Sequence, residues 1–289
     1  MGLKVGIQLY SVRNALSADP YGTLAKVAEA GFKYVEAANH NANEDDGVGF
    51  GVPAKAMKES LDRLGMKIVG CHINPLNPDR LPAVLDYHAE LGNRQIGCDI
   101  EFFPYGDIDF VKRRCELFNR VGELCRERGM RYYYHNHFQE FQRFGDKTVY
   151  EIIMENTDPE LVFAEMDTFW ITRGGADPVE LIERYRDRLL LLHQKDFPAD
   201  APQPICMFDA GVDRQKEIDY SVFEQYVLPS CFAEIGTGVL PIQRIIDAAS
   251  EAPNLEYIVL EQDHTRLGEL NSIRVSMDAF RKFRGIEFD

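Results

Sequence analysis

Short hydrophobic runs alternate with amphipathic helical patterns along almost the whole chain, and this alternation limits the possible folds more than any other feature. The runs are rich in β-branched and aromatic residues and show no polar–apolar alternation, which indicates a parallel sheet covered on both faces. Several helical patterns end at a glycine, the residue that closes helices in the left-handed conformation. The predicted strands cover residues 5–10, 34–37, 67–70, 95–98, 131–135, 161–166, 189–193 and 257–261. The predicted helices cover about 21–29, 54–64, 81–91, 107–128, 148–156, 178–185, 242–252 and 272–283.

Eight such units in 289 residues favour a closed (β/α)8 TIM barrel of the α/β class, with residues 1–289 forming a single domain. The second possibility is a doubly wound open sheet. Its dinucleotide-binding form requires GxGxxG after the first strand, and the sequence has no such motif there. The interval of about 198–238 interrupts the rhythm and is rich in Pro, Asp and Gly. We expect either an extended loop over the barrel mouth or a surface insertion.

The net charge of −15 argues against nucleic acid or an acidic membrane as a partner, because both require a basic surface. The sequence also lacks an apolar run of the roughly 18 residues that a transmembrane helix needs. The six cysteines form no CxxC pair, and the first strand pattern begins almost at the N-terminus. Reduced thiols and the lack of room for a signal peptide predict a cytoplasmic protein.

Potential metal ligands follow four consecutive predicted strands. His135, His137 and Glu140 follow the fifth strand, Glu165 and Asp167 end the sixth, His193 and Lys195 end the seventh, and Glu261 and Asp263 end the eighth. In a TIM barrel these positions meet at one rim, where the active site lies. Carboxylates gathered there repel one another, and a divalent cation relieves that repulsion. Carboxylate oxygens with an imidazole suit Mn²⁺, Mg²⁺, Co²⁺ or Zn²⁺, so we expect one divalent metal ion.

The same residues lie within motifs that resemble the xylose isomerase-like TIM-barrel superfamily. The closest likeness is to its sugar phosphate isomerase/epimerase branch, which includes inosose dehydratases, ketose 3-epimerases and, more distantly, endonuclease IV of the AP endonuclease 2 family. The motifs are QLYSVR at 8–13, HNHFQEF at 135–141, DTFW at 167–170, HQKD at 193–196, EIGTG at 234–238 and EQD at 261–263.

The resemblance implies one metal ion held by Glu, Asp, His and Glu from the last four strands. Asp167, His193 and Glu261 match three of these positions. Many relatives carry the first Glu at the end of strand five, where this sequence has Tyr134 and His135. Glu140 is the nearest carboxylate, with His135 or His137 as substitutes. Endonuclease IV binds three zinc ions through additional histidines, and this chain has only seven histidines, which argues against a nuclease.

The ligand set predicts an isomerase or epimerase acting on a keto-sugar or cyclitol through an enediolate. Glu140 and Glu261 would move the proton on opposite faces of the substrate, and Lys195 would neutralise the developing oxyanion. If a β-hydroxyl leaves instead, with His137 or Lys195 assisting, the same intermediate gives a dehydratase of the inosose dehydratase type. A non-catalytic sugar-binding barrel is the remaining alternative.

Four more residues are candidates for substrate binding: His72, Trp170, Glu36 and His135. For each there is a structural alternative. His72 can be a satisfied loop histidine, Glu36 can bond a neighbouring loop, and Trp170 can belong to the core. The aromatic pair Phe102 and Phe103 suits the interface of a homo-oligomer, if the pair is exposed.

Overall fold

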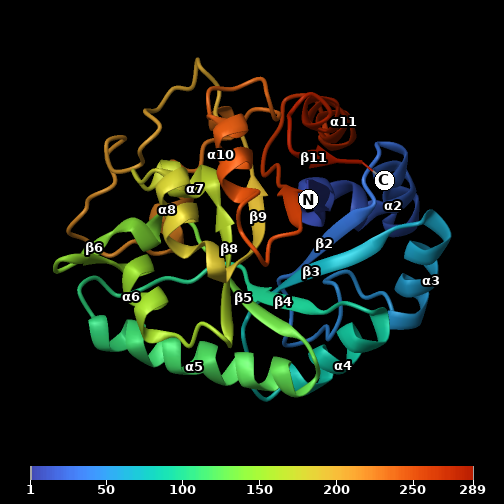
Figure 1. The fold of residues 1–289 in the computed structure, drawn as a ribbon, viewed down its shortest axis with the longest axis horizontal. Coiled ribbons are helices and arrows are strands. Elements are labelled where there is room, and N and C mark those ends of the chain that lie inside the picture. Colours follow the sequence, from blue (N-terminus) through green and yellow to red (C-terminus); the bar gives the residue numbers. More distant parts are fainter. Residues whose placement is uncertain (1, 289) are drawn as a thin grey trace.

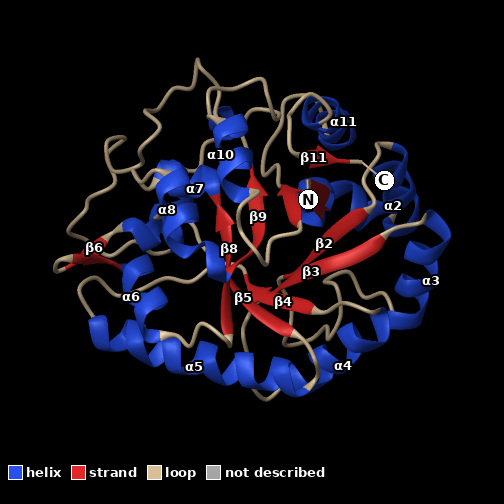
Figure 2. Cartoon of the chain, in the orientation of Figure 1, coloured by secondary structure: helices blue, strands red, loops and turns tan. Residues whose placement is uncertain are grey.

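The computed structural model describes residues 2–288 and confirms the predicted TIM barrel. Eight parallel strands form a closed barrel surrounded by helices (Figures 1 and 2). Closure comes from the pairing of the first strand with the last, where Lys4 is opposite Tyr257. The barrel strands are β1 (Leu3–Gln8), β2 (Tyr34–Asn39), β3 (Lys67–Ile73), β4 (Gln95–Cys98), β5 (Arg131–His135), β8 (Val162–Asp167), β9 (Leu189–Gln194) and β10 (Tyr257–Leu260).

Three short strands lie outside the barrel. β11 (Ile286–Glu287) pairs with β1, and β6 (Arg143–Phe144) pairs antiparallel with β7 (Lys147–Thr148). The helices are α1 (Arg13–Ala18), α2 (Pro20–Glu29), α3 (Ala54–Leu64), α4 (Leu81–Leu91), α5 (Ile108–Glu127), α6 (Val149–Asn156), α7 (Thr168–Arg173), α8 (Pro178–Tyr185), α9 (Tyr220–Tyr226), α10 (Ile242–Ala249) and α11 (Glu269–Phe280). The predicted glycine stops are confirmed at Gly65 and Gly92, which close α3 and α4 with φ of 65° and 89°.

Side chains of each strand point alternately into the barrel and toward the helices. On β5, Tyr133 points inward and packs with Leu191 and Val259. Its neighbour Tyr134 points outward against α5, with its ring centroid 5.2 Å from that of Phe118. A side chain's place in the barrel therefore changes with a shift of one residue along the strand, and this alternation decides which polar groups reach the mouth.

Most element boundaries agree with the sequence prediction to within a few residues. Three short helices were not expected. α1 lies between β1 and α2, α7 follows β8 directly, and α9 lies within the interval of about 198–238. The last helix begins at Glu269 rather than Ser272. The expectation that Phe102 and Phe103 form an exposed pair is wrong, because Phe103 is buried and Phe102 packs against Tyr220 and Phe223 of α9.

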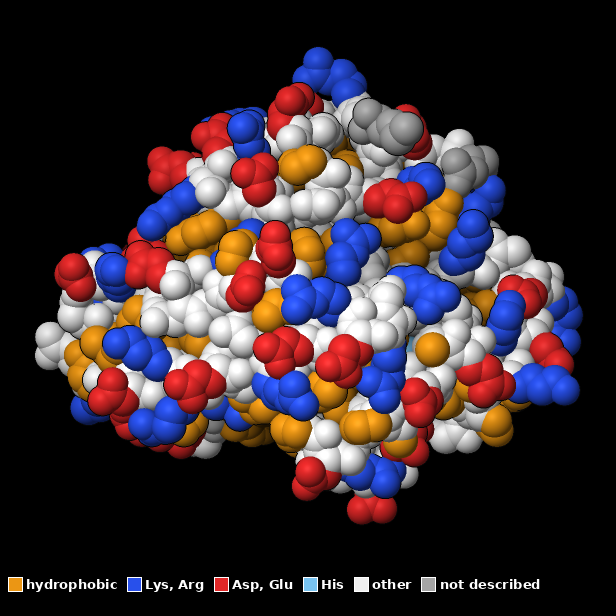
Figure 3. Space-filling model, turned by 60° about the horizontal axis from the view of Figure 1, so that its bottom comes forward, with side chains coloured by type: hydrophobic (Ala, Val, Ile, Leu, Met, Phe, Trp, Pro, Cys, Tyr) orange, Lys and Arg blue, Asp and Glu red, His pale blue; other side chains and the backbone are white. Residues whose placement is uncertain are grey.

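The surface in Figure 3 shows acidic and basic side chains intermixed, with small hydrophobic areas between them. On this face the charges are not separated by sign. Among residues 2–288, every helix is too short or too polar to cross a lipid bilayer.

Candidate active site

A cavity of about 310 Å³ opens at the carboxyl ends of the barrel strands. Its lining combines imidazoles and carboxylates with aromatic rings, a mixture suited to a small polar ligand with apolar faces. The lining residues are Tyr10, His40, His72, Asn74, Asp99, Ile100, His135, His137, Trp170, Tyr220, Phe223, Val227, Glu261, Asp263 and His264. Three of them, Tyr220, Phe223 and Val227, belong to the interval of about 198–238, which therefore contributes one wall of the cavity.

Four buried side chains at the floor of this cavity form the mouth group: His135, Asp167, His193 and Glu261. They come from the ends of β5, β8 and β9 and from the residue that follows β10. One ligand atom from each lies within 4.8 Å of the others. One oxygen of Asp167 accepts a hydrogen bond of 2.8 Å from the backbone of Trp170 at the start of α7, which fixes the carboxylate.

Lys195 lies beside the mouth group and donates hydrogen bonds to both Asp167 and Glu261. Its ammonium group is buried, and the charge of Asp167 raises its pKa although burial favours the neutral amine. Burial would favour protonated Glu261, but Lys195 and His193 hold the pKa of this carboxyl well below its usual range. The mouth of the barrel therefore holds a charged lysine that bridges Asp167 and the charged carboxylate of Glu261.

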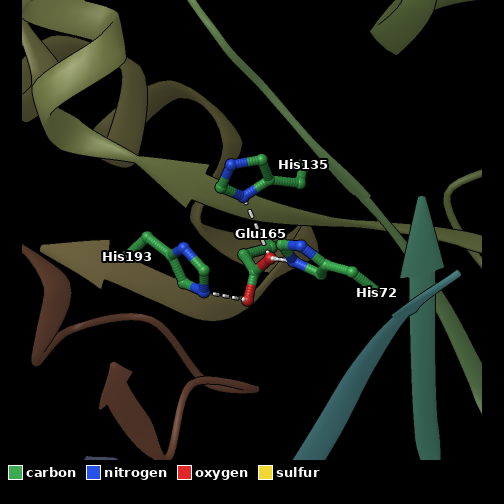
Figure 4. Close-up of side chains that lie close together, drawn as sticks. All are labelled: His72, His135, Glu165 and His193. Atoms are coloured by element: carbon green, nitrogen blue, oxygen red, sulfur yellow. Dashed lines mark hydrogen bonds and ion pairs between the residues drawn. The ribbon is translucent and has the colours of Figure 1, made fainter. Parts of the chain in front are cut away.

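A second layer of polar side chains, the inner group, lies one step deeper in the barrel and consists of Glu36, His72 and Glu165. Figure 4 shows three imidazoles directed at the Glu165 carboxylate. His72 Nε2 lies 2.6 Å from Glu165 Oε2, and His135 Nδ1 lies 3.0 Å from the same oxygen. His193 Nε2 lies 3.0 Å from Glu165 Oε1 and 2.6 Å from Glu36 Oε2.

The carboxylates of the inner group are balanced by His72 and by His193 of the mouth group. Burial opposes a charge on His72, yet the carboxylates of Glu36 and Glu165 raise its pKa to about 9. In return, His193 and His72 hold the pKa of Glu165 well below its usual range, against the effect of burial. Burial and the charge of Glu165 raise the pKa of Glu36. The buried imidazoles and carboxylates thus stabilise one another as ion pairs.

The donor set of the mouth group fits a divalent cation. It offers two carboxylates and two imidazoles, and His135 and Glu261 also line the cavity, so a ligand could reach the ion. A second set, formed by His72, His135, Glu165 and His193, is also close enough to hold an ion. This second set has only one carboxylate, whereas the mouth group has two. The mouth group is therefore the better match to the oxygen ligands that divalent cations prefer.

Glu140, expected as a metal ligand and as one of the two proton-transfer groups, belongs to neither of the two ligand clusters found among residues 2–288. Glu140 follows the strand in a 3-10 turn, and its carboxylate accepts hydrogen bonds from the Tyr134 hydroxyl at 2.7 Å and the His137 backbone at 2.9 Å. Tyr134 points outward, so Glu140 is held on the outer side of the strand. Burial raises the pKa of Glu140 to about 7. His135, the substitute considered for this position, lies in the mouth group instead.

Three polar atoms in the cavity wall make no hydrogen bond within residues 2–288: His137 Nδ1, Trp170 Nε1 and Asp263 Oδ1. The ring centroids of His137 and Trp170 are 5.4 Å apart, and burial lowers the pKa of His137 well below its usual range. The cavity wall thus contains a neutral imidazole, an indole N–H and a carboxyl group, which are chemical groups that can hydrogen-bond the hydroxyl groups of a polyol.

His40 and Asp99 are cavity residues that the sequence did not single out. His40 Nε2 lies 3.2 Å from Asp99 Oδ2, and the His40 ring lies 5.4 Å from that of Tyr10. Each follows a barrel strand: His40 comes directly after β2, and Asp99 directly after β4. The rule that polar residues at strand ends face the mouth would have found both residues, had it been applied to the first four strands.

Asp196, in the HQKD motif, has a structural role. Its carboxylate accepts hydrogen bonds from the backbone N–H groups of Phe197, Gly236, Gly238 and Leu240, at 2.8 to 3.1 Å. Gly238 has no room for a side chain, since a Cβ there would lie 2.3 Å from Asp196 Oδ1. The EIGTG segment is therefore a turn built around Asp196 rather than a ligand-binding loop.

This structure defines a TIM-barrel protein with a cluster of metal-ligand side chains in its mouth. The family described as xylose isomerase-like TIM barrel matches residues 24–283, and the chain belongs to it. The resemblance predicted from the sequence is thereby confirmed.

Curated relatives include the inosose dehydratase of Geobacillus kaustophilus, 30% identical over 145 residues, which are 50% of this chain and 43% of the relative. Inosose dehydratase 2 of Bacillus cereus is 29% identical over 147 residues, 50% of this chain and 44% of that protein. The matches thus span less than half the length of these relatives.

Solved structures show the same fold. A sugar phosphate isomerase/epimerase from Parabacteroides distasonis superposes with a TM-score of 0.75 at 24% identity, covering 99% of this chain and 96% of that one. A probable 3-DHS dehydratase from Bacillus anthracis gives a TM-score of 0.64 at 13% identity, covering 97% and 99%.

Proposed function

We propose that this protein is a metal-dependent isomerase or epimerase that acts on a keto-sugar or cyclitol by removing a proton next to the carbonyl group. The observation that carries this proposal is the mouth group, whose four ligand atoms lie within 4.8 Å of one another at the floor of a cavity. The membership of the chain in the xylose isomerase-like family supports it.

His135, Asp167, His193 and Glu261 would hold the divalent ion, for which Mn²⁺ is the first choice to test. When bound, the ion supplies positive charge that makes the proton next to the carbonyl more acidic and stabilises the enediolate. Glu261 lines the cavity as a charged carboxylate and is the group that takes this proton. The Lys195 ammonium donates hydrogen bonds to Asp167 and Glu261, and its charge lowers the pKa of Glu261.

With Glu140 outside the cavity, another group has to return the proton. Asp263 is suited to this task, because burial raises the pKa of its carboxyl to about 7 and its Oδ1 lies 3.8 Å from Lys195 Nζ without a hydrogen bond in the described structure. A carboxyl group with this pKa is partly protonated at neutral pH. Return of the proton to the opposite face gives epimerisation, and return to the neighbouring carbon gives isomerisation.

The second candidate is a dehydratase of the inosose dehydratase type, favoured by the names of the curated relatives. The first step would be the same, and a β-hydroxyl would then leave as water. His137 and Trp170 face the cavity and lie in reach of such a hydroxyl. A sugar-binding barrel without catalysis is the third candidate, and it predicts binding with no exchange of carbon-bound protons.

The test is incubation of the Mn²⁺-loaded protein with a panel of ketoses and inososes in D₂O, followed by NMR and mass spectrometry. Deuterium incorporation with an isomeric product supports the proposal, and loss of one water identifies the dehydratase. Glu261→Gln should abolish incorporation, whereas Glu256→Gln, at an exposed carboxylate just before β10, should leave it unchanged. Incorporation by Glu261→Gln at the wild-type rate would exclude Glu261 as the base.

A further inference from the structure

A second cavity, of about 250 Å³, adjoins the central one on the side of β1 and β2. Tyr10 and His40 line both cavities. These two rings, 5.4 Å apart, therefore separate the second cavity from the central one. The His40 side chain is about half exposed (47%), and it contacts Asp99 through Nε2 and Tyr10 through its ring. A ligand in the central cavity could thus extend past His40 into the second cavity.

The walls of the second cavity are mainly apolar. Leu9, Leu16, Ala38 and Phe50 contribute carbon surface, and Tyr10 adds the face of its ring. Gly49 lets the chain pass close to β2 there, with φ of 91°, and a Cβ at this position would lie 2.4 Å from the Ala38 carbonyl oxygen. The chain from Asn41 to Phe50 is therefore packed tightly against the strand while leaving the cavity open.

Arg13 is the cation in this lining, and two of its five N–H donors make hydrogen bonds to backbone carbonyls. One terminal nitrogen donates to the Tyr10 carbonyl at 3.0 Å, and the other donates to the Asp263 carbonyl at 2.7 Å. The guanidinium carbon lies 4.1 Å from the centroid of the Tyr10 ring, so the group stacks on that ring. Arg13 thus links the second cavity to the segment that carries Asp263. Its flat guanidinium group can stack on an aromatic ring, as it does on the ring of Tyr10.

We propose that the second cavity is a subsite for an apolar, ring-sized substituent on the substrate. The substrate would then be a keto-sugar or cyclitol that carries an apolar group, such as an aryl glycoside with a ketone in its sugar ring, rather than a free monosaccharide. This inference rests on the proposed function, because it assumes that a sugar ring occupies the central cavity. A cavity of about 150 Å³ lined by apolar side chains is enough to hold benzene, so about 250 Å³ accommodates an aromatic ring.

The chain provides a built-in probe for binding. Trp170 is the only tryptophan and lines the central cavity, so a bound sugar should change its fluorescence. We would titrate the Mn²⁺-containing protein with the methyl and phenyl β-glycosides of glucose and galactose. Burial of the phenyl ring should lower Kd by about tenfold relative to the methyl compound in at least one of the two sugars.

Ser17→Phe is the variant that tests whether the phenyl ring binds in the second cavity. Ser17 is exposed on α1 and lies at the rim of the second cavity, so a phenylalanine there should fill part of it. This variant should lose the preference for the phenyl glycoside while binding the methyl glycoside as before. Ala18→Phe, at the next exposed position of the same helix and outside the lining, is the matched control and should keep the preference.

Three results would overturn the proposal. The first is that no phenyl glycoside binds more tightly than its methyl partner. The second is a preference that Ser17→Phe leaves intact, which would place the ring elsewhere. The third is tighter binding of glucose 6-phosphate that Ser17→Phe abolishes, which would assign the cavity to an anionic group. The glycosides have no carbonyl group and undergo no exchange, so failure here is distinguishable from failure of deuterium incorporation into a free ketose.

Discussion

His193 Nε2 lies 2.6 Å from Oε2 of Glu36, and both side chains are buried at the centre of the barrel. The other nitrogen of the ring, Nδ1, lies 3.0 Å from Glu261 Oε2 in the mouth group. One nitrogen is thus turned toward the proposed metal and the other toward a carboxylate. Such a carboxylate fixes the tautomer and the orientation of a metal-binding imidazole.

Glu36→Gln should therefore weaken Mn²⁺ binding although Glu36 belongs to the inner group and not to the mouth group. Loss of such a supporting carboxylate lowers metal affinity by about 10- to 100-fold. Calorimetric titration of the metal-free protein with Mn²⁺ measures this directly. Glu140→Gln is the control, because Glu140 is also a buried carboxylate but lies outside both groups. Equal affinity of Glu36→Gln and the wild type would show that Glu36 does not support the site.

Lys195→Met should lower the free energy of unfolding in the absence of metal by about 3–5 kcal/mol, because Asp167 and Glu261 would lose a buried cationic partner. Mn²⁺ bound between the same carboxylates would replace the missing charge. The rise in melting temperature on adding Mn²⁺ should accordingly be larger in the variant than in the wild type. Thermal unfolding with and without Mn²⁺ tests this, and an equal rise in both proteins would contradict it.

Asp196→Ala should destabilise the protein by about 2–4 kcal/mol, since four backbone N–H groups lose their common acceptor. Urea unfolding followed by circular dichroism gives the change. Asp200→Ala, at an exposed aspartate of the same segment, should change stability by less than about 0.5 kcal/mol. If the two variants were equally stable, the turn around Asp196 would not depend on its carboxylate.

The burial of His88 predicts that the protein is less stable in acid. Burial lowers its pKa from 6.5 to about 4. Below pH 6.5 the imidazole of His88 is protonated in the unfolded chain but stays neutral in the folded protein. The free energy of unfolding therefore falls as the pH drops toward about 4. The full decrease in the free energy of unfolding is about 3 kcal/mol.

The measurement is the urea unfolding free energy at pH 7 and pH 4.5 for the wild type and His88→Gln. Glutamine carries no titrating group and can still pair with Asn93, whose side-chain nitrogen lies 3.2 Å from His88 Nδ1. The variant should lose less stability than the wild type between the two pH values. An identical loss in both proteins would assign the acid sensitivity to other groups.

The sequence by itself determined the architecture and three members of the mouth group. Hydrophobic runs without alternation, each followed by an amphipathic helix, fit few arrangements other than a barrel of parallel strands. Parallel strands also bring their carboxyl ends to one rim, which is why Asp167, His193 and Glu261 could be placed together from their positions alone.

Only the tertiary structure decided between His135 and Glu140 and revealed the inner group. The choice at β5 depends on which side of the strand each side chain takes, and Glu140 is turned outward by its hydrogen bond to Tyr134. Glu36 and Glu165 lie within their strands and 129 residues apart in sequence, so no local pattern sets them beside His193. Closure of the barrel brings them together, because the inward-pointing side chains of all its strands share one buried interior.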